Sequence, residues 1–454
     1  MSMIVVLVGV LVVVVFAVMI FQRPALGLYL GVALSGFLMT PDLPVVGTRL
    51  AVPDIPLLLA LIGLVIALSL SRSLALPQDH TVRSVLTIFI IFLFLAVVSL
   101  CINSIFRHMD LLNSLVEVAS YIYGFSIAVA MILLVDDWQK WHRFVMFWLI
   151  GVAVVSAISV LAVLGLGPEW AHHGGGRIKS TTRAVNQLPS YIAPAIPLLV
   201  GLYVVSARNR LAAIWTVPVL LAVVIALSVT GSRLALAMSA FVLVASIIYC
   251  ARYIRRYPLT AMSVFVISLS VFLIASYYVV AIIAMGPEAL PETMRGLVRP
   301  IERTVTAASF DEYLGARGEQ LGIILNNFHH GLLLGVGPAN FMEVFNHRHS
   351  VHSTYFSVYI ELGLISLVLL LAAMVLLVVR GYEAARRLDD SKQSIMLGMA
   401  VIAFLTLCIY GVATFGLRQR IFWLIIGLLL AGLNIAWKER NARLQGFASS
   451  DRTA

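Results

Sequence analysis

Charged residues are scarce in this chain. They make up 11% of it, against roughly 25% in globular proteins. Hydrophobic residues account for 61%, and the mean hydropathy is +1.02. This composition excludes a protein with one soluble core. The apolar runs contain Gly and Pro and are separated by short polar breaks, which favours membrane-spanning helices over the weak alternation of a barrel. We therefore predict an all-α polytopic membrane protein.

Cysteine is also rare, and several sequence motifs are absent. Cys101, Cys250 and Cys408 lie within or at the ends of apolar runs, so they are interpreted as small core residues, not as a disulfide framework or metal site. The chain has no Walker loop, dinucleotide fingerprint or nucleophile elbow, so ATP hydrolysis and redox chemistry have no support. The net charge of +10 does not indicate a nucleic-acid partner, because no soluble basic domain exists to hold one.

The apolar runs predict the membrane helices. A span needs roughly 20 apolar residues, which gives about 12–13 helices here. The first run lacks a basic leading segment, so we expect a retained helix and not a cleaved signal peptide. The expected spans are 3–21, 25–40, 55–70, 84–105, 111–135, 144–166, 188–206, 212–230, 234–250, 259–285, 353–379, 394–414 and 421–437.

Basic residues predict the orientation, because Lys and Arg stay on the cytoplasmic side. They fall in alternate loops, which places loops 167–187 and 286–352 on the outer side. The expected regions are 1–166 (N-terminal spans), 167–285 (spans with an outward loop and a T-G-S-R hairpin), 286–352 (the large outer loop), 353–437 (C-terminal spans) and 438–454 (a cytoplasmic tail).

The two outer loops carry the most information. Loop 286–352 is too long for a bare connection, and it contains two amphipathic segments that predict helices. Gly335, Gly337 and Pro338 predict a turn after them. Loop 167–187 is basic despite its outer position, which indicates an anionic ligand.

A histidine-rich stretch, H-R-H-S-V-H-S-T-Y, lies at the mouth of the apolar run Ser353–Val379. Polar groups at such a junction are costly without a purpose. If a helix begins near Ser350, His352 lies in its first turn beside unpaired N–H groups that suit a diphosphate. Histidine also readily accepts a proton near neutral pH. Two alternatives stay open: interfacial histidines without a role, or a metal site built from His347, His349 and His352, with His329 and His330 as further ligands.

Three arginines are candidates for an anion site, since guanidinium pairs well with phosphate. Arg233 is the last residue of the T-G-S-R motif. The alternative to anion binding is that its side chain only extends to the membrane surface. Arg317 lies on a predicted helix in the large loop, where ion pairs within the helix are the alternative. Arg183 could bind phosphate, while Asn186 could bind a sugar hydroxyl or cap a helix.

These motifs together resemble the O-antigen ligase/polymerase superfamily. The resemblance is carried by T-G-S-R, the arginine-bearing helix of the outer loop, G-V-G-P-A-N-F, and H-S-V-H-S-T-Y followed by E-L-G-L, and it extends from about Arg183 to Leu364. It implies a GT-C-type glycosyltransferase of the bacterial inner membrane with a helical periplasmic loop. It also implies a metal- and nucleotide-independent reaction that takes a glycan from undecaprenyl diphosphate at the periplasmic face.

The resemblance also implies particular residues. The essential arginine of the S-R motif corresponds to Arg233, after Ser232, and the essential histidine to His352. The loop arginine corresponds to Arg317, with competitors Arg295, Arg299 and Arg303. His352 would activate the acceptor hydroxyl, and arginines would stabilise the leaving diphosphate. The expected substrate-binding residues are Arg183, Asn186, Ser232, His349 and Tyr355.

The acceptor and the function class stay open. A ligase would use the lipid A core, and a repeat-unit polymerase would use a second lipid-linked glycan. A lipid or polysaccharide transporter would instead place polar residues near the bilayer midplane, whereas this chain concentrates them at the outer ends, with Asn113 and Glu117 as exceptions. A structural assembly subunit would leave the histidine and arginine cluster unexplained.

Overall fold

The computed structural model describes most of the chain as helices. The described residues are 16–38, 51–71, 77–106, 111–173, 177–206, 210–230, 232–251, 253, 316–347 and 350–450. Seven described helices are long and apolar enough to cross a membrane, and four shorter apolar helices accompany them. The protein is therefore an all-helical, multi-pass membrane protein, as its composition predicts.

The described residues of the N-terminal half are mainly helical and include a small strand pair. The expected span 259–285 and most of 3–21 lie outside the described residues. The described helices of this half are α2 (Pro24–Leu34), α3 (Asp54–Ser71), α4 (His80–Phe106), α5 (Leu111–Leu134), α6 (Trp138–Val163), α7 (Gln187–Ile192), α8 (Ala195–Val205), α9 (Arg210–Val229) and α10 (Arg233–Ala251). A 3-10 turn, η1 (Glu169–Ala171), precedes the antiparallel strands β1 (His172–His173) and β2 (Arg177–Ile178).

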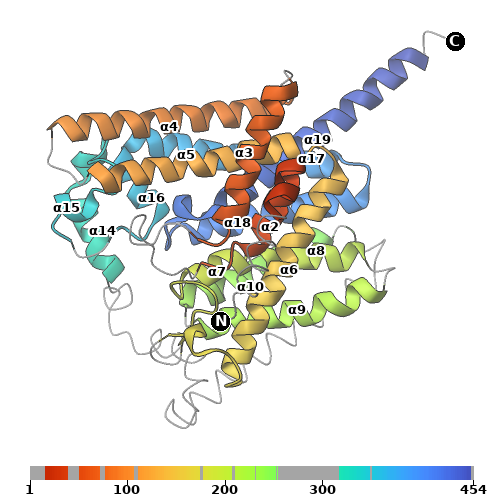
Figure 1. Ribbon diagram of the computed structural model, residues 1–454, viewed down its shortest axis with the longest axis horizontal. Coiled ribbons are helices and arrows are strands. Elements are labelled where there is room, and N and C mark those ends of the chain that lie inside the picture. The colour runs from red at the N-terminus through yellow and green to blue at the C-terminus, as the bar shows by residue number, and fades with distance from the viewer. Residues whose placement is uncertain are drawn as a thin grey trace.

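The C-terminal half begins in the large outer loop. Its elements there are α14 (Ala316–Asn326), η3 (Phe328–Gly331) and α15 (Phe341–Val344). They lie beside the left-hand ends of α4 and α5 in Figure 1. The remaining elements are α16 (Thr354–Ser357), the π-helical turn η4 (Val358–Leu362), α17 (Leu364–Arg387), α18 (Ser391–Tyr410), η5 (Gly416–Arg418) and α19 (Arg420–Ser450).

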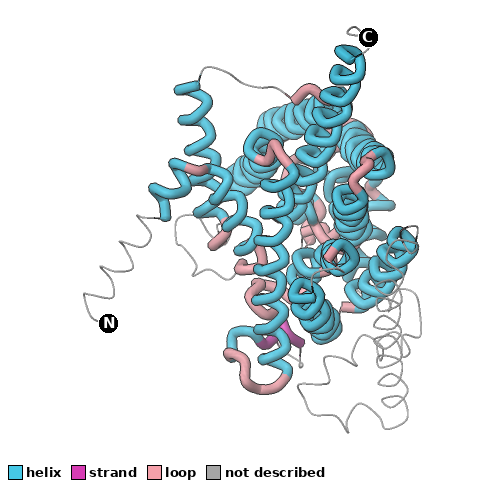
Figure 2. The backbone as a smooth tube through the Cα atoms, turned by 90° about the vertical axis from the view of Figure 1, so that its right-hand side faces the viewer, coloured by secondary structure: helices cyan, strands magenta, loops and turns pink. Residues whose placement is uncertain are grey.

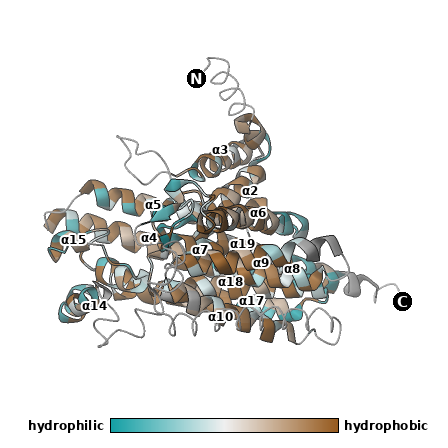
Figure 3. Ribbon diagram, turned by 90° about the horizontal axis from the view of Figure 1, so that it is seen from below, coloured by the Kyte–Doolittle hydropathy of each residue, from teal (hydrophilic) through white to brown (hydrophobic). Residues whose placement is uncertain are grey.

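The core of the bundle forms around α19. This helix packs against α5, α17 and α18, while α4 packs against α17, and α8 packs between α9 and α18. Figure 2 shows several of these helices nearly end-on. The contact of α5 with α19 requires a glycine, because a Cβ at Gly124 would lie 2.2 Å from the indole ring of Trp423. Apolar residues dominate the middle of the helices in Figure 3, where α17, α18 and α19 are brown.

The described part of the outer loop has its own small core. Ile324, Phe341, Val351 and Ile360 are buried together, apart from the main cluster. The helix expected around Arg317 is present as α14. Gly335 and Gly337 have φ of +67° and +100°, which confirms the expected turn. The first amphipathic segment of this loop lies outside the described residues.

The span expected at 353–379 begins later than predicted. The chain is interrupted at Gly363, where φ is +93° and a Cβ would lie 1.7 Å from the Leu333 carbonyl oxygen. The outer loop crosses here, so only glycine fits and the helix restarts at Leu364. The expected helix start near Ser350 is also wrong, because Ser353 caps α16 through a bond from the Phe356 N–H. His352 therefore precedes the helix and is not in its first turn.

Candidate functional site

A cavity of about 440 Å³ opens at the end of the bundle that the sequence predicts to face outward. This outer end is where α6 and α9 end, where α5 begins and where the loop between α18 and α19 lies. The cavity brings together five segments that are distant in the sequence. Its polar and charged lining residues include Glu117, Ser120, Tyr123, Arg183, Asn186, Gln187, Ser350, His352, Thr414, Arg418, Gln419 and Arg420.

Arg418, in the α18–α19 loop, and Arg420, at the start of α19, are each paired with a carboxylate. Glu117 lines the cavity and Asp54 does not. Arg418 Nε donates to Glu117 Oε1 at 2.6 Å. Arg420 binds Asp54 side-on, with Nε 2.8 Å from Oδ1 and Nη2 2.6 Å from Oδ2. Asp54 is held in turn by the Tyr123 hydroxyl at 3.1 Å and the Ala51 N–H at 2.7 Å.

The exposure of these pairs is asymmetric. The Glu117 and Asp54 side chains are 0% and 2% exposed, whereas those of Arg418 and Arg420 are 33% and 20% exposed. A buried carboxylate is stable only when paired and hydrogen-bonded, so each acid fixes one edge of a guanidinium. A guanidinium carries five N–H donors, and each of these pairs uses one edge. Both guanidinium groups also line the cavity.

Arg183 lies on the opposite wall, in the turns between β2 and α7, and is half-buried. Its loop is attached to the end of α2 by two bonds of Thr181. The Thr181 Oγ1 donates to the Gly36 carbonyl at 2.6 Å, and the Leu38 N–H donates to the Thr181 carbonyl at 3.0 Å. With Arg418 and Arg420, three guanidinium groups are among the described residues that line the cavity, and Glu117 is the described carboxylate among them.

Asn186 lines the cavity with an exposed side chain. It occupies the N-cap position of α7, but its side chain makes no capping hydrogen bond. The role expected for its side chain as a helix cap is therefore wrong. Its carbonyl accepts the Tyr410 hydroxyl at 3.1 Å, so the backbone is fixed while the amide faces the cavity.

His352 is exposed and lines the same cavity. The segment carrying it is supported by Gln320 of α14, which is 4% exposed. The His352 N–H donates to Gln320 Oε1 at 3.3 Å, and Gln320 Nε2 donates to the Ser350 carbonyl at 3.0 Å. The Thr354 N–H donates to the Gly411 carbonyl at 2.8 Å on the other side. The outer loop and the α18–α19 loop together position this histidine.

Two predicted site residues have structural partners away from the cavity. Ser232 caps α10, with its Oγ accepting the Ala235 N–H at 3.4 Å. The hairpin before it is held by Arg177, whose Nε donates to the Thr230 carbonyl at 2.7 Å. The Tyr355 hydroxyl donates to the Cys408 carbonyl at 2.5 Å, and this residue does not line the cavity.

Three predicted residues fall partly or wholly outside the described residues. Arg233 is the first residue of α10, and Arg317 lies in the first turn of α14, but neither side chain is described. His349 is outside the described residues altogether. His347 Nε2 lies 3.9 Å from Glu319 Oε2. Within the part of the chain that is described, no group of three or more His, Cys, Asp or Glu side chains is arranged to hold a metal ion.

A further carboxylate lies behind Arg418, in the short π-helical turn outside the spanning helices. Glu361 is 1% exposed and accepts the Ala339 N–H at 3.2 Å through Oε2. Burial raises the pKa of Glu361 to about 7, and nearby Glu117 raises it too, whereas Arg418 opposes the shift. Its carbonyl also accepts the Gly337 N–H at 3.0 Å. Glu361 thus attaches the outer-loop turn to the wall of the cavity.

Sequence reasoning missed Arg418, Arg420, Asp54 and Gln320. The motif G-L-R-Q-R contains the two arginines and lies in a loop that the sequence predicts to face outward. Basic residues are uncommon on that side, so this motif could have indicated a functional role. Comparison of the chain with protein-family models and with curated proteins gave no match. What the cavity binds must therefore be inferred from its own residues.

Proposed function

We propose that the cavity is the active site of a membrane glycosyltransferase. It would take a glycan from undecaprenyl diphosphate and pass it to an acceptor hydroxyl at the outer face of the bacterial inner membrane. The observation that supports this most is the pair of guanidinium groups, Arg418 and Arg420, held by buried carboxylates and opening onto the cavity that His352 lines. A diphosphate matches such a site in charge and in hydrogen-bonding geometry.

The arginines would act on the leaving group. When the bond between the anomeric carbon and the diphosphate oxygen breaks, the electron pair stays with the diphosphate. Donors already in place stabilise that charge without reorganisation, and one such donor is typically worth about 3–4 kcal/mol. Within the described part of the chain, the cationic side chains that line the cavity and could take this role are Arg183, Arg418 and Arg420. By the family resemblance, Arg233 and Arg317 would add to them.

His352 would act on the acceptor. In the proposed step its imidazole takes the proton of the acceptor hydroxyl while the hydroxyl oxygen attacks the anomeric carbon from the face opposite the diphosphate. The configuration at that carbon inverts. The exposed side chain of His352 at the cavity leaves room for an acceptor to approach. The reaction as proposed uses neither a nucleotide nor a metal ion.

We favour the lipid A core as acceptor, which makes the protein an O-antigen ligase-type enzyme. Glycan analysis of cells lacking the protein tests this directly. Loss of lipid A-linked polymer with intact lipid-linked polymer supports a ligase. Accumulation of single repeat units would show a polymerase instead. Unchanged glycans together with altered solute uptake would overturn both and favour a transporter.

A purified assay tests the chemistry. The protein in liposomes receives undecaprenyl diphosphate-linked glycan and acceptor, and transfer is followed by mass change of the acceptor. We expect His352→Ala to lose transfer by about 10²–10⁴-fold, the usual contribution of a general base. His329→Ala is the matched control, because His329 is exposed at the same end and does not line the cavity. Full transfer by the His352 variant would refute the base assignment.

A further inference from the structure

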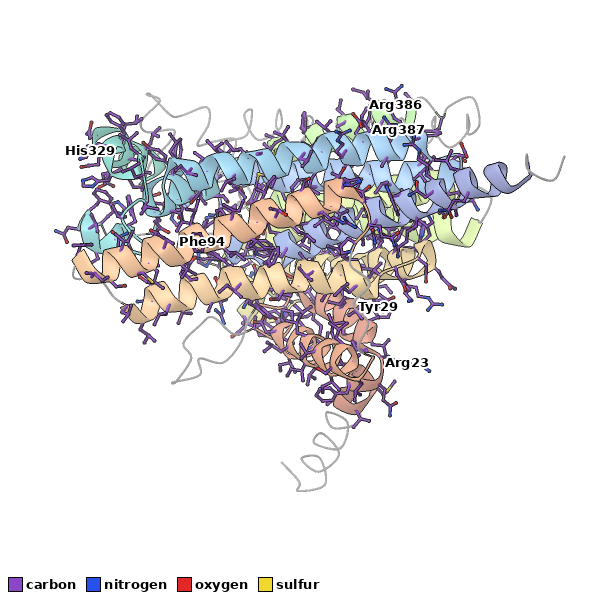
Figure 4. The ribbon with its side chains drawn as sticks, turned by 90° about the horizontal axis from the view of Figure 1, so that it is seen from above. Arg23, Tyr29, Phe94, His329, Arg386 and Arg387 are labelled. Atoms are coloured by element: carbon purple, nitrogen blue, oxygen red, sulfur yellow. The ribbon has the colours of Figure 1, made fainter. Side chains whose placement is uncertain are left out.

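A second groove, of about 460 Å³, lies at the opposite end of the bundle. It is formed by the start of α4, the end of α17 and the polar part of α19. Figure 4 shows Arg386 and Arg387 at this end of the long helices and His329 at the other. The basic residues predict that this end faces the cytoplasm. Leu433, Ala436 and Trp437 give the groove one apolar wall.

Most charges of this groove are already paired with each other. Glu383 lies between Arg380 at 3.0 Å and Arg387 at 3.7 Å. Arg443 pairs with Asp389. A third acid, Asp79, accepts the Val82 N–H at 3.0 Å at the start of α4. These groups hold the walls together.

Two adjacent residues of α19 differ from the rest. The Oε2 atom of Glu439 is buried and has no hydrogen-bond partner among the described residues. Burying a carboxylate oxygen without a donor is costly. Arg440 lines the groove beside it and forms no ion pair within the described residues. Glu439 can therefore accept a hydrogen bond from a cationic group, and the neighbouring Arg440 can bind an anionic group.

We infer that this groove binds a phosphoethanolamine headgroup of a membrane phospholipid. The ammonium group would donate to Glu439 Oε2, and the phosphate would pair with Arg440. Trp437, which lines the groove and is half-buried, would lie at the headgroup level, where Trp is enriched. Basic pockets between helices on the cytoplasmic side are a recurring form of lipid recognition.

The charges of the groove favour phosphoethanolamine over purely anionic headgroups. The described residues that line the groove include four arginines and four acids, so these residues give no excess positive charge to favour a purely anionic lipid. Phosphocholine has the same net charge as phosphoethanolamine, but its quaternary ammonium has no N–H to donate. Only a headgroup with both a phosphate and an N–H donor satisfies Glu439 and Arg440 at once.

Native mass spectrometry of the full-length protein in detergent tests the assignment. Phosphatidylethanolamine, phosphatidylcholine and phosphatidylglycerol with identical acyl chains are titrated, and bound lipid is counted. We expect phosphatidylethanolamine to bind about tenfold more tightly than the other two, a difference equal to one charged hydrogen bond. Glu439→Gln and Arg440→Gln should each remove the preference. Lys438→Gln is the matched control, because Lys438 is an exposed neighbour on α19 that does not line the groove.

The outcomes separate clearly. Equal binding of the three lipids by the wild type overturns the inference, and so does a preference that persists in Glu439→Gln. Tighter binding of phosphatidylglycerol would show a purely anionic site and would also overturn it. Size-exclusion profiles of the variants show that they are folded, and two separate variants protect the test against the misfolding of one. Glycan transfer is not part of the readout, so the result is independent of the proposed enzymatic activity.

Discussion

Glu117 and Arg418 form a 2.6 Å ion pair across 301 positions of sequence, with the carboxylate fully buried and the guanidinium open to the outer cavity. We predict that Glu117→Gln lowers glycan transfer by about 10²-fold, since one edge of Arg418 loses its charged anchor and its other donors lose their orientation. The measurement is the transfer rate of the reconstituted variant. An unchanged rate would contradict a role for this pair in positioning Arg418.

The same pair predicts non-additive stability changes. Removing one partner of a buried pair leaves the other charge uncompensated, which costs about 3–5 kcal/mol. Arg418→Met alone should therefore lower the free energy of unfolding strongly, and Glu117→Leu with Arg418→Met should recover part of the loss. Denaturation in mixed micelles gives both values. A double variant as unstable as the sum of the single variants would show that the two residues are not coupled.

Gln320 should act as a positioning residue for His352. Its amide bonds both the His352 N–H and the Ser350 carbonyl, so Gln320→Leu removes two contacts of the segment. We expect kcat to fall about tenfold or more with a smaller change in KM, and the pH profile of kcat to keep its shape, because the ionising group remains. Asn327→Leu is the control, because it alters an amide of the same loop that bonds the Ile323 carbonyl and does not line the cavity. A shifted pH profile would indicate that Gln320 acts by another route.

Glu361 predicts a pH dependence of stability. Its pKa is raised from an ordinary value of 4.5 to about 7 in the folded protein, so the folded state binds more protons than the unfolded state between these values. The free energy of unfolding therefore falls as the pH rises from about 4.5 to 7, by roughly 3 kcal/mol at most.

Glu361→Gln provides the comparison for this prediction, because it keeps an acceptor for the Ala339 N–H and cannot ionise. Thermal unfolding of both proteins across pH 5 to 8 is the measurement. As the pH increases, the melting temperature of the variant should rise relative to that of the wild type. Curves that stay parallel would show that Glu361 does not titrate in this range.

Local patterns in the sequence predicted a bundle of apolar helices, because membrane crossing depends on length and hydropathy. Of the roughly 12–13 expected spans, seven are long enough to cross a membrane in the described part of the chain, and four more are present as shorter apolar helices. The local patterns predicted the start of the 353–379 span poorly. A long apolar run does not reveal that the Leu333 carbonyl crosses at Gly363, since that contact joins two distant segments. The His352 segment was identified, but the helix start was misplaced, because Ser350 and Ser353 are both good N-cap residues.

The site itself depends on long-range pairing. Arg418 and Arg420 were detectable as basic residues on the outer side, but Asp54 and Glu117 were not recognisable as their partners. Nothing local links Asp54 to Arg420, which lies 366 positions away. Gln320 was equally hidden, because its partners are backbone groups of a different segment. Residue type and spacing predict which groups are unusual, whereas the fold decides which of them meet.

The Asp54–Arg420 pair has a consequence for how the protein is made. Asp54 leaves the ribosome 366 residues before its partner, and synthesis at about 5–20 residues per second makes that interval roughly 20–70 s. Throughout this time the carboxylate of α3 lacks Arg420, the arginine with which it pairs in the folded protein. The N-terminal helices must therefore wait at the membrane, protonated or hydrated, until α19 is inserted. Assembly of the cavity is thus one of the last events in biogenesis, and chains truncated before α19 should be targets for membrane proteases.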